Sequence, residues 1–427
     1  MKNFFLRNCI TVYATLFLVF FTAKQSSAQT PYSSKAVKFV ESIPVREMKA
    51  EKVNKVEKKA KPDIDEEINE KNRKIIKRII PNVKSTPDAA ITSTISRQNI
   101  PSPNVINVPG VNFEGLASID NFALFGSVVA PPDDNGEVGL NHYVQTVNLC
   151  FRVFSKAGVA LTAPTKFSTL FAALGAPIGT RDDGDPIVLY DQLADRWLIS
   201  QFITLANPNN HQVIAISKTG DPTGQYYLYD FMMPNNKFND YPHFGVWSDA
   251  YYMSDNQFNQ AGTAFLGAGA FAFDRNKMLA GDPTASYIYF DQFAACPSCV
   301  GQLPTDLDGF VAPPPGMGNL FMEFRATEFG DPVDGLRIFE FKPNFVTPAS
   351  STYLQVGAAD LPLAAFDAKF PGGRSVIEQP GTANGLDAIA DRLMHRLAYR
   401  NLGTPGAPTN SWVLNFCLLY TSDAADE

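Results

Sequence analysis

Histidine and cysteine are scarce in this sequence, and the common catalytic motifs are missing. The 427 residues include four histidines and five cysteines. No His-Glu-x-x-His zinc motif, Gly-x-Ser-x-Gly nucleophile motif or Gly-Lys-Ser/Thr phosphate loop occurs. These absences argue against a zinc hydrolase, a serine hydrolase and a P-loop nucleotidase. The histidines share no ligand-like spacing, and we expect His142 to make a structural hydrogen bond in a turn; the four are His142, His211, His243 and His395.

The few cysteines do not form a disulfide-built scaffold. Cys9 lies directly before the N-terminal apolar run, and Cys150 stands alone. Cys296 and Cys299 form one C-x-x-C in a Pro-containing stretch. We expect these two to form a structural disulfide, with a reduced pair and redox catalysis as the alternatives.

Basic residues are in deficit over most of the chain. Residues 112–416 contain 17 basic and 30 acidic residues, whereas residues 46–78 contain 12 basic and 8 acidic ones. An acidic domain repels phosphate backbones, which argues against a nucleic-acid partner. The 30 acidic residues comprise 24 Asp and 6 Glu. Because Asp favours turns and Glu favours helices, this bias predicts a domain rich in strands and turns.

The first 28 residues have the pattern of a secretory signal peptide. Lys2 and Arg7 precede an apolar run from Ile10 to Ala23, which is too short for a confident membrane span. Ser26 and Ala28 stand at the −3 and −1 positions of a small-residue cleavage site. We therefore expect an exported protein, secreted or at the outer cell surface, that begins at Gln29 and has no membrane span after cleavage.

Residues 29–111 are predicted to be a tether. Their middle part is rich in Lys and Glu without aromatic residues, and residues 85–109 are rich in Ser, Thr, Pro and Asn. Ile64, Ile68, Ile75 and Ile79 lie near one helical face, so the tether is expected to be disordered or partly helical.

Residues 112–416 contain an internal repeat. An Asp-containing turn is followed by an aromatic or large apolar strand five times, at spacings of 54, 54, 70 and 72 residues; the landmarks are Tyr143, Trp197, Tyr251, Phe321 and Leu393. A second strand, ending in a basic residue, follows each of the first four copies at Lys156, Lys218, Arg275 and Lys342. In the middle two copies a Gly-Asp-Pro turn leads to a further strand.

Each repeat thus supplies about four strands, which cannot bury both faces of a sheet alone. Radial stacking of four-stranded sheets buries these faces, so the repeat predicts an all-β domain with a β-propeller arrangement. A β-sandwich with a similar number of strands is the alternative.

Two blocks of the repeat region resemble a known group of proteins. Residues 131–145 (PPDDNGEVGLNHYVQ) and 185–202 (DPIVLYDQLADRWLISQF) are similar to two signature blocks of a family of large secreted bacterial proteins with propeller-like repeats. The resemblance extends from about Gly115 to Leu402. It implies a Gram-negative source and a C-terminal sorting or adhesion module, and it implies no catalytic residues.

The last 11 residues, 417–427 (CLLYTSDAADE), resemble the translation of a transposase sequencing adapter. We therefore expect this segment to be an artefact that packs against nothing, and the natural reading frame to continue differently after Phe416.

Clustered acidic residues are the strongest polar feature of the domain. Asp133, Asp134, Asn135 and Glu137 occupy one short segment. Oxygen ligands at this spacing suit Ca²⁺, so the sequence predicts a calcium site there. The alternative is that each Asp caps its own turn, as at the similar groups Asp182, Asp183, Asp185 and Asp306, Asp308.

Two functions fit the sequence. The preferred hypothesis is a non-catalytic secreted or surface propeller that binds an extracellular glycan or protein. The alternative is a polysaccharide hydrolase whose carboxylates come from different blades and meet at the central funnel. The two differ in what lies on the axis: converging carboxylates favour the enzyme, whereas aromatic and amide side chains favour the binding protein.

The calcium site is tested by thermal melting. If the segment from Asp133 to Glu137 binds Ca²⁺, a hundredfold excess over Kd adds about 2.7 kcal/mol to the free energy of unfolding. The melting temperature is then expected to rise in millimolar Ca²⁺ and to fall again with chelator. Identical melting curves in the two solutions would favour the turn-capping alternative.

Overall fold

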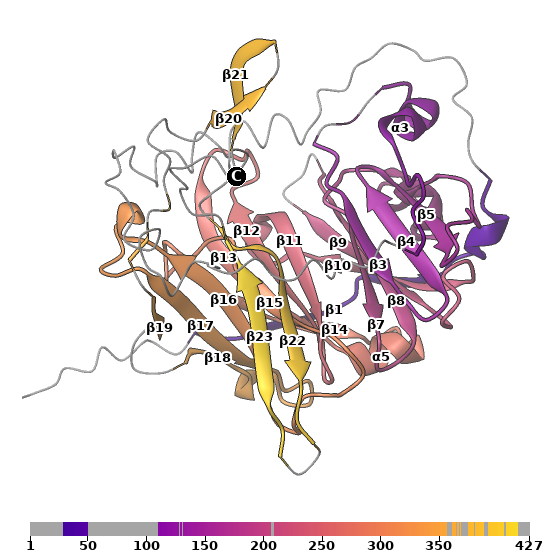
Figure 1. The fold of residues 1–427 in the computed structure, drawn as a ribbon. Helices are drawn as coiled ribbons and strands as arrows, with labels where there is room; N and C mark the ends of the chain where they lie inside the picture. Colours follow the sequence, from indigo (N-terminus) through magenta and orange to yellow (C-terminus); the bar gives the residue numbers. More distant parts are fainter. Residues whose placement is uncertain are drawn as a thin grey trace, which may run out of the picture.

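The computed structural model describes residues 29–49 and 110–416, except for positions 128, 130, 206–208, 357–360, 364, 367, 369–374, 380, 388–391 and 405–406. The signal peptide, residues 50–109 of the tether and the adapter-like segment 417–427 lie outside the described residues, so those interpretations remain predictions. The described part consists mainly of β-strands (Figure 1).

Four successive antiparallel sheets account for most of the domain. The first blade contains β3 (Asn135–Val138), β4 (His142–Val147), β5 (Cys150–Ser155) and β6 (Thr165–Lys166). The second contains β7 (Ile187–Asp191), β8 (Arg196–Ile203), β9 (His211–Ser217) and β10 (Tyr226–Met232). The third contains β11 (Phe238–Val246), β12 (Tyr251–Phe258), β13 (Phe265–Phe273) and β14 (Ser286–Asp291). The fourth contains β15 (Leu303–Leu307), β16 (Asn319–Arg325), β17 (Gly335–Lys342) and β18 (Thr352–Gln355).

The first strands of these sheets lie side by side: β3 contacts β7, β7 contacts β11, and β11 contacts β15. The other strands of each sheet follow outward in chain order. Figure 1 shows the four sheets fanning out, from the purple first blade on the right to the orange fourth blade on the left. This is a β-propeller arrangement, as the repeat predicted.

Shorter elements connect and flank the blades. The α-helices of the described part are α3 (Ser118–Phe125), α4 (Phe167–Leu170) and α5 (Arg275–Ala280). The 3-10 helices are η1 (Val45–Glu47), η2 (Ala172–Leu174), η3 (Ile178–Thr180), η4 (Pro234–Asn236), η5 (Thr327–Phe329) and η6 (Pro348–Ser350). After the fourth blade come β19 (Leu361–Pro362), which pairs with β17, the hairpin β20 (Ser375–Gln379) and β21 (Thr382–Asp387), and the hairpin β22 (Met394–Asn401) and β23 (Asn410–Asn415).

The landmark residues of the repeat are equivalent in four of the five copies. Tyr143, Trp197, Tyr251 and Phe321 all lie in the second strand of their blade. Leu393 does not: it directly precedes β22, which pairs in parallel with β15 and antiparallel with β23. The prediction that Leu393 occupies an equivalent second-strand position was wrong. It relied on a short Ala-Asp-Arg sequence similarity and not on an aromatic residue.

The basic landmarks mark the third strands. Lys156 and Lys218 directly follow β5 and β9, Arg275 follows the end of β13, and Lys342 ends β17. Their prediction as a second repeated element is therefore confirmed.

Apolar faces of neighbouring blades pack together. Phe151 and Trp197 belong to the core between the first two blades, and Tyr252 and Phe321 to the core between the last two. Burying one such large side chain contributes about 1.5–3 kcal/mol, so these interfaces hold the sheets in their radial order.

The N-terminal segment completes two blades, which differs from the predicted tether. β1 (Tyr32–Lys35) pairs with β14, and β2 (Lys38–Glu41) pairs with β10. The segment therefore provides the outermost strand of both the second and third blades, and Val45 beyond it is buried. Composition did not reveal these strands because each has only four residues, each contains charged residues, and neither belongs to a repeat.

A variant at Phe39 tests the importance of this segment. The Phe39 ring lies 5.0 Å from the Tyr229 ring and packs against the core between the second and third blades. Phe39→Ala is expected to lower the free energy of unfolding by about 2 kcal/mol in denaturant titrations. The control Val37→Ala truncates a side chain that is 52% exposed. It should change the free energy of unfolding by less than about 0.5 kcal/mol. Equal effects of the two variants would contradict a structural role for β2.

Candidate functional site

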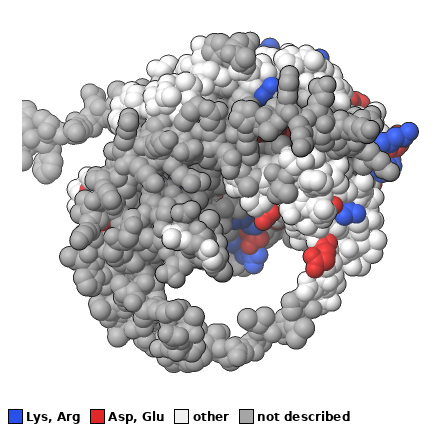
Figure 2. All heavy atoms as spheres, turned by 90° about the horizontal axis from the view of Figure 1, so that it is seen from above, with Lys and Arg blue, Asp and Glu red and all other residues white. Residues whose placement is uncertain are grey.

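Ionisable side chains from separate elements meet along the inner strands. We call Glu137 on β3, Asp306 on β15, Asp308 just beyond it and Arg396 on β22 the axial cluster. The Nε atom of Arg396 lies 3.0 Å from Asp306 Oδ2, and its Nη2 atom lies 3.5 Å from Asp308 Oδ1. Figure 2 shows acidic and basic side chains together in the hollow at the middle of the face seen from above.

Burial disfavours the charged forms of two carboxylates in the axial cluster. It raises the pKa of Glu137 to about 7, helped by the negative charge of Asp306 and opposed by Arg396. It also raises the pKa of Asp306 to about 6, against the effects of Arg396 and of the Val246 amide that donates to Asp306 Oδ1 at 2.9 Å. Two carboxyl groups near one another thus change protonation state close to neutral pH, which is a common property of functional sites.

A chain of hydrogen bonds connects the first three blades. Asn148 Nδ2 donates to Asp133 Oδ2 at 2.5 Å, and Asn148 Oδ1 accepts from the Asp185 amide at 3.1 Å. Asp185 Oδ2 in turn accepts from the Tyr241 amide at 3.0 Å. Asp133, Asp185 and Tyr241 have φ values of 41°, 46° and 54°. These left-handed conformations are unfavourable for such residues, and the hydrogen bonds offset their cost.

Aromatic and imidazole rings lie next to this chain. The Tyr241 ring meets the His243 ring edge-on at 4.3 Å, and His243 stacks on His395 at 5.6 Å. The guanidinium group of Arg392 lies 4.7 Å from the centre of the Tyr241 ring. The rings come from β11 and β22, so the hairpin after the fourth blade closes onto the inner strand of the third.

His243 is buried without hydrogen-bond partners. His243 is only 7% exposed, and neither Nδ1 nor Nε2 of its ring has a hydrogen-bond partner. Burial and the nearby charges of His395 and Arg392 hold its pKa well below the ordinary value, so the imidazole is neutral. Most buried polar groups in proteins are hydrogen-bonded, so a buried ring with two unpaired nitrogens is exceptional.

The residues predicted to bind calcium serve different local purposes. Asp133 accepts from Asn148, and Asn135 Oδ1 accepts from the Val188 amide at 2.7 Å. Glu137 belongs to the axial cluster, and Asp134 is exposed. The calcium site remains a prediction that the melting experiment tests.

Asp182 and Asp183 accept hydrogen bonds from residues distant in the chain, so the expectation that each Asp caps its own turn is not met here. Asp182 accepts from the amide and hydroxyl of Ser168 at 2.6 and 2.7 Å. Asp183 pairs with Arg181 at 2.5 Å and accepts from the Thr204 amide at 2.8 Å. These carboxylates therefore fix the loop that leads into β7.

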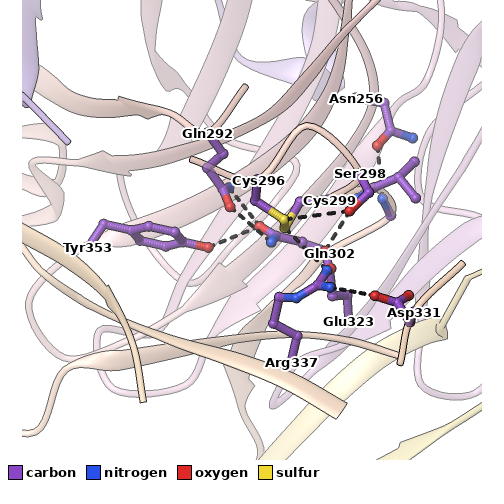
Figure 3. Close-up of polar contacts among 12 residues, drawn as sticks. Asn256, Gln292, Cys296, Ser298, Cys299, Gln302, Glu323, Asp331, Arg337 and Tyr353 are labelled. Atoms are coloured by element: carbon purple, nitrogen blue, oxygen red, sulfur yellow. Dashed lines mark hydrogen bonds and ion pairs between the residues drawn. A yellow bond between two sulfur atoms is a disulfide. The ribbon is translucent and has the colours of Figure 1, made fainter. Parts of the chain in front are cut away.

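A second polar network surrounds the C-x-x-C, which forms the expected disulfide between Cys296 and Cys299 (Figure 3). Arg337 on β17 pairs with Glu323 on β16 and with Asp331, the latter at 2.9 Å. Among the described His, Cys, Asp and Glu residues, a group close enough to share a metal ion comprises Cys296, Cys299 and Glu323. The disulfide occupies both sulfur atoms, so this group is not a metal site in its oxidised form.

A separate pocket of about 420 Å³ lies beside the first blade. Phe113 and Tyr143 form its aromatic wall, with ring centres 6.1 Å apart, and Gln145 and Lys156 contribute polar groups. Val138 also lines it, directly after Glu137 on β3.

Glu137 and Asp306 were recognisable in the sequence as clustered acidic residues, whereas nothing in the sequence marked Arg396, His243 and His395 as site residues. The two histidines are far apart in the chain and share no motif. They meet because β22 lies beside the inner strands, and no repeat signal predicted this position for β22.

The sequence matches no protein-family model and no curated protein. Among solved structures, an α-L-arabinanase of Penicillium chrysogenum is similar at a TM-score of 0.33 and 9% identity, covering 65% of this chain and 87% of that one. An exo-1,5-α-L-arabinanase from a bovine ruminal metagenomic library is similar at a TM-score of 0.27 and 10% identity, covering 55% of this chain and 76% of that one. A GH43_1 enzyme of Xanthomonas citri is similar at a TM-score of 0.25 and 14% identity, covering 52% of this chain and 72% of that one.

Replacing Glu137 tests the electrostatics of the axial cluster. The folded pKa of about 7 exceeds the ordinary value of 4.5, so the folded state retains a proton that the unfolded state releases. The free energy of unfolding should therefore fall as the pH rises from about 4.5 to about 7, and the whole contribution of this proton should be lost above about pH 7. Glu137→Gln is expected to be more stable than wild type at about pH 8 and little different at about pH 4.

The control for this comparison is Glu47→Gln, which changes an exposed glutamate outside the site. It should leave the pH dependence of unfolding as in wild type. A Glu137→Gln variant with the wild-type pH dependence would show that Glu137 is ordinarily hydrated.

Proposed function

We propose that this protein is an exported propeller that binds an extracellular glycan at the inner strands, next to the axial cluster. The observation that carries the proposal is the pair of unpaired ring nitrogens on buried His243. A neutral imidazole offers one donor and one acceptor, which matches a sugar hydroxyl group.

The surroundings of His243 fit the same class of ligand. The Tyr241 and His395 rings provide apolar surfaces of the kind that pack on the face of a sugar ring. Glu137 and Arg396 add an acceptor and a donor for further hydroxyl groups. Binding sites of this kind combine aromatic walls with a few polar groups that fix the orientation of the ligand.

The extracellular setting follows from the predicted signal peptide, and the acidic domain disfavours nucleic acid as the partner. Across the described residues, no helix combines the length and the apolar character needed to cross a membrane.

A propeller hydrolase acting on polysaccharide is the second candidate, favoured by the convergence of Glu137, Asp306 and Asp308 and by the raised pKa values of Glu137 and Asp306. Glycoside hydrolysis requires one carboxyl group that is protonated and one that is ionised. If Glu137 donates a proton and Asp306 acts as the ionised partner, turnover should be highest between about pH 6 and pH 7.

Binding is tested with a glycan array followed by calorimetry on the glycans that bind. His243→Phe keeps a ring but removes both nitrogens, and it should weaken binding about tenfold through the lost hydrogen bonds. The matched control is His142→Phe at the first residue of β4, which should bind as wild type does. Equal affinities of wild type and His243→Phe would contradict a ligand contact at His243.

The same glycans distinguish a binding protein from an enzyme. Chromatography after prolonged incubation should show intact glycan if the protein only binds. Shortened products that disappear with Glu137→Gln, while the affinity is retained, would establish the hydrolase instead.

A further inference from the structure

The disulfide lies at the seam between the third and fourth blades, independently of the proposed glycan site. It closes the loop that joins β14, the last strand of the third blade, to β15, the first of the fourth. Around it, Gln302 Oε1 accepts from Gln292 at 2.7 Å and from the Tyr353 hydroxyl at 2.9 Å (Figure 3). The loop is thus tied to both blades.

The disulfide contributes little as a cross-link. Cys296 and Cys299 are three residues apart. Stabilisation through the unfolded chain grows with loop length, from about 3 kcal/mol for a 15-residue loop, so a loop this short gains less. Cross-linking alone therefore gives a weak account of the pair.

The two sulfur atoms have different surroundings. Cys296 is partly exposed, whereas Cys299 is fully buried. Arg337 Nη1 lies 3.5 Å from Cys299 Sγ, in position to donate to it. A positive charge beside a sulfur stabilises its thiolate form and makes that sulfur the better leaving group.

We propose that Cys296 and Cys299 form a thiol–disulfide exchange site, which takes a small thiol of the glutathione class. The thiolate attacks Sγ of Cys296, the S–S bond breaks, and its electron pair remains on Sγ of Cys299 beside Arg337. A second thiolate then attacks the mixed disulfide and releases the Cys296 thiolate. One protein disulfide and two thiols thus become one protein dithiol and one small disulfide.

Glu323 is close enough to the disulfide to exchange a proton with the sulfur atom that leaves. Its carboxylate lies within 4.8 Å of both cysteine sulfurs. Burial raises the pKa of Glu323 to about 7, with Arg337 opposing the shift. A carboxyl group with this pKa exchanges a proton with the Cys299 thiolate near neutral pH.

The test equilibrates the folded protein in glutathione buffers of varied ratio, followed by acid quenching, alkylation and mass spectrometry. Cys150 is a buried free thiol in the first blade, so its alkylation under native conditions reports unfolding. We expect Cys296 and Cys299 to become reduced over the glutathione range while Cys150 stays protected. A pair that stays oxidised, or that is reduced only when Cys150 becomes alkylated, would overturn the proposal.

A pair of variants on β17 tests the role of Arg337. Arg337→Gln should slow reduction of the disulfide by glutathione about tenfold, because the leaving sulfur loses its cationic neighbour. Lys342→Gln removes a positive charge from the same strand, where Lys342 pairs with Glu340, and should reduce at the wild-type rate. Equal rates for all three proteins would show that Arg337 does not act on the sulfur. If Arg337→Gln fails to fold, the wild-type equilibrium still decides the proposal.

Discussion

The packing of each blade against the next is the interaction on which the rest of the structure depends. No blade has a core of its own: Phe151 and Trp197 share one core across the first seam, and Tyr252 and Phe321 share another across the third. At the second seam, the buried Asp191 carboxylate pairs with Arg275 at 2.7 Å and accepts from the Tyr251 hydroxyl at 2.8 Å. Removing either partner of a buried ion pair leaves the other charge buried and uncompensated, which strongly destabilises the folded state. This contact therefore fixes how the second and third blades meet.

Radial packing also explains why polar groups collect along the inner strands. Side chains of β3, β15 and β22 come from distant parts of the sequence and share a restricted space. Burial there shifts the pKa values of Glu137 and Asp306 upward and leaves His243 neutral. The fold thus brings together a set of polar groups that no single blade contains.

The sequence predicted the parts of the fold that repeat. Tyr143, Trp197 and Tyr251 follow similar turns at similar spacings, so their equivalent positions in the second strands were predictable. The strands β1 and β2 were not, because they join the outer edges of finished sheets and leave no periodic signal. The meeting of His243 and His395 was also unpredictable, since it depends on where β22 lies relative to β11.

The central claim is that a glycan contacts the unpaired nitrogens of His243. NMR of the ¹⁵N-labelled histidine side chains measures the protonation and hydrogen bonding of this ring directly. The account predicts that His243 stays neutral at a pH well below its ordinary pKa, and that its two nitrogen signals shift when a glycan that binds is added. A His243 ring that protonates near its ordinary pKa of 6.5, with nitrogen signals unchanged by the glycan, would contradict the account.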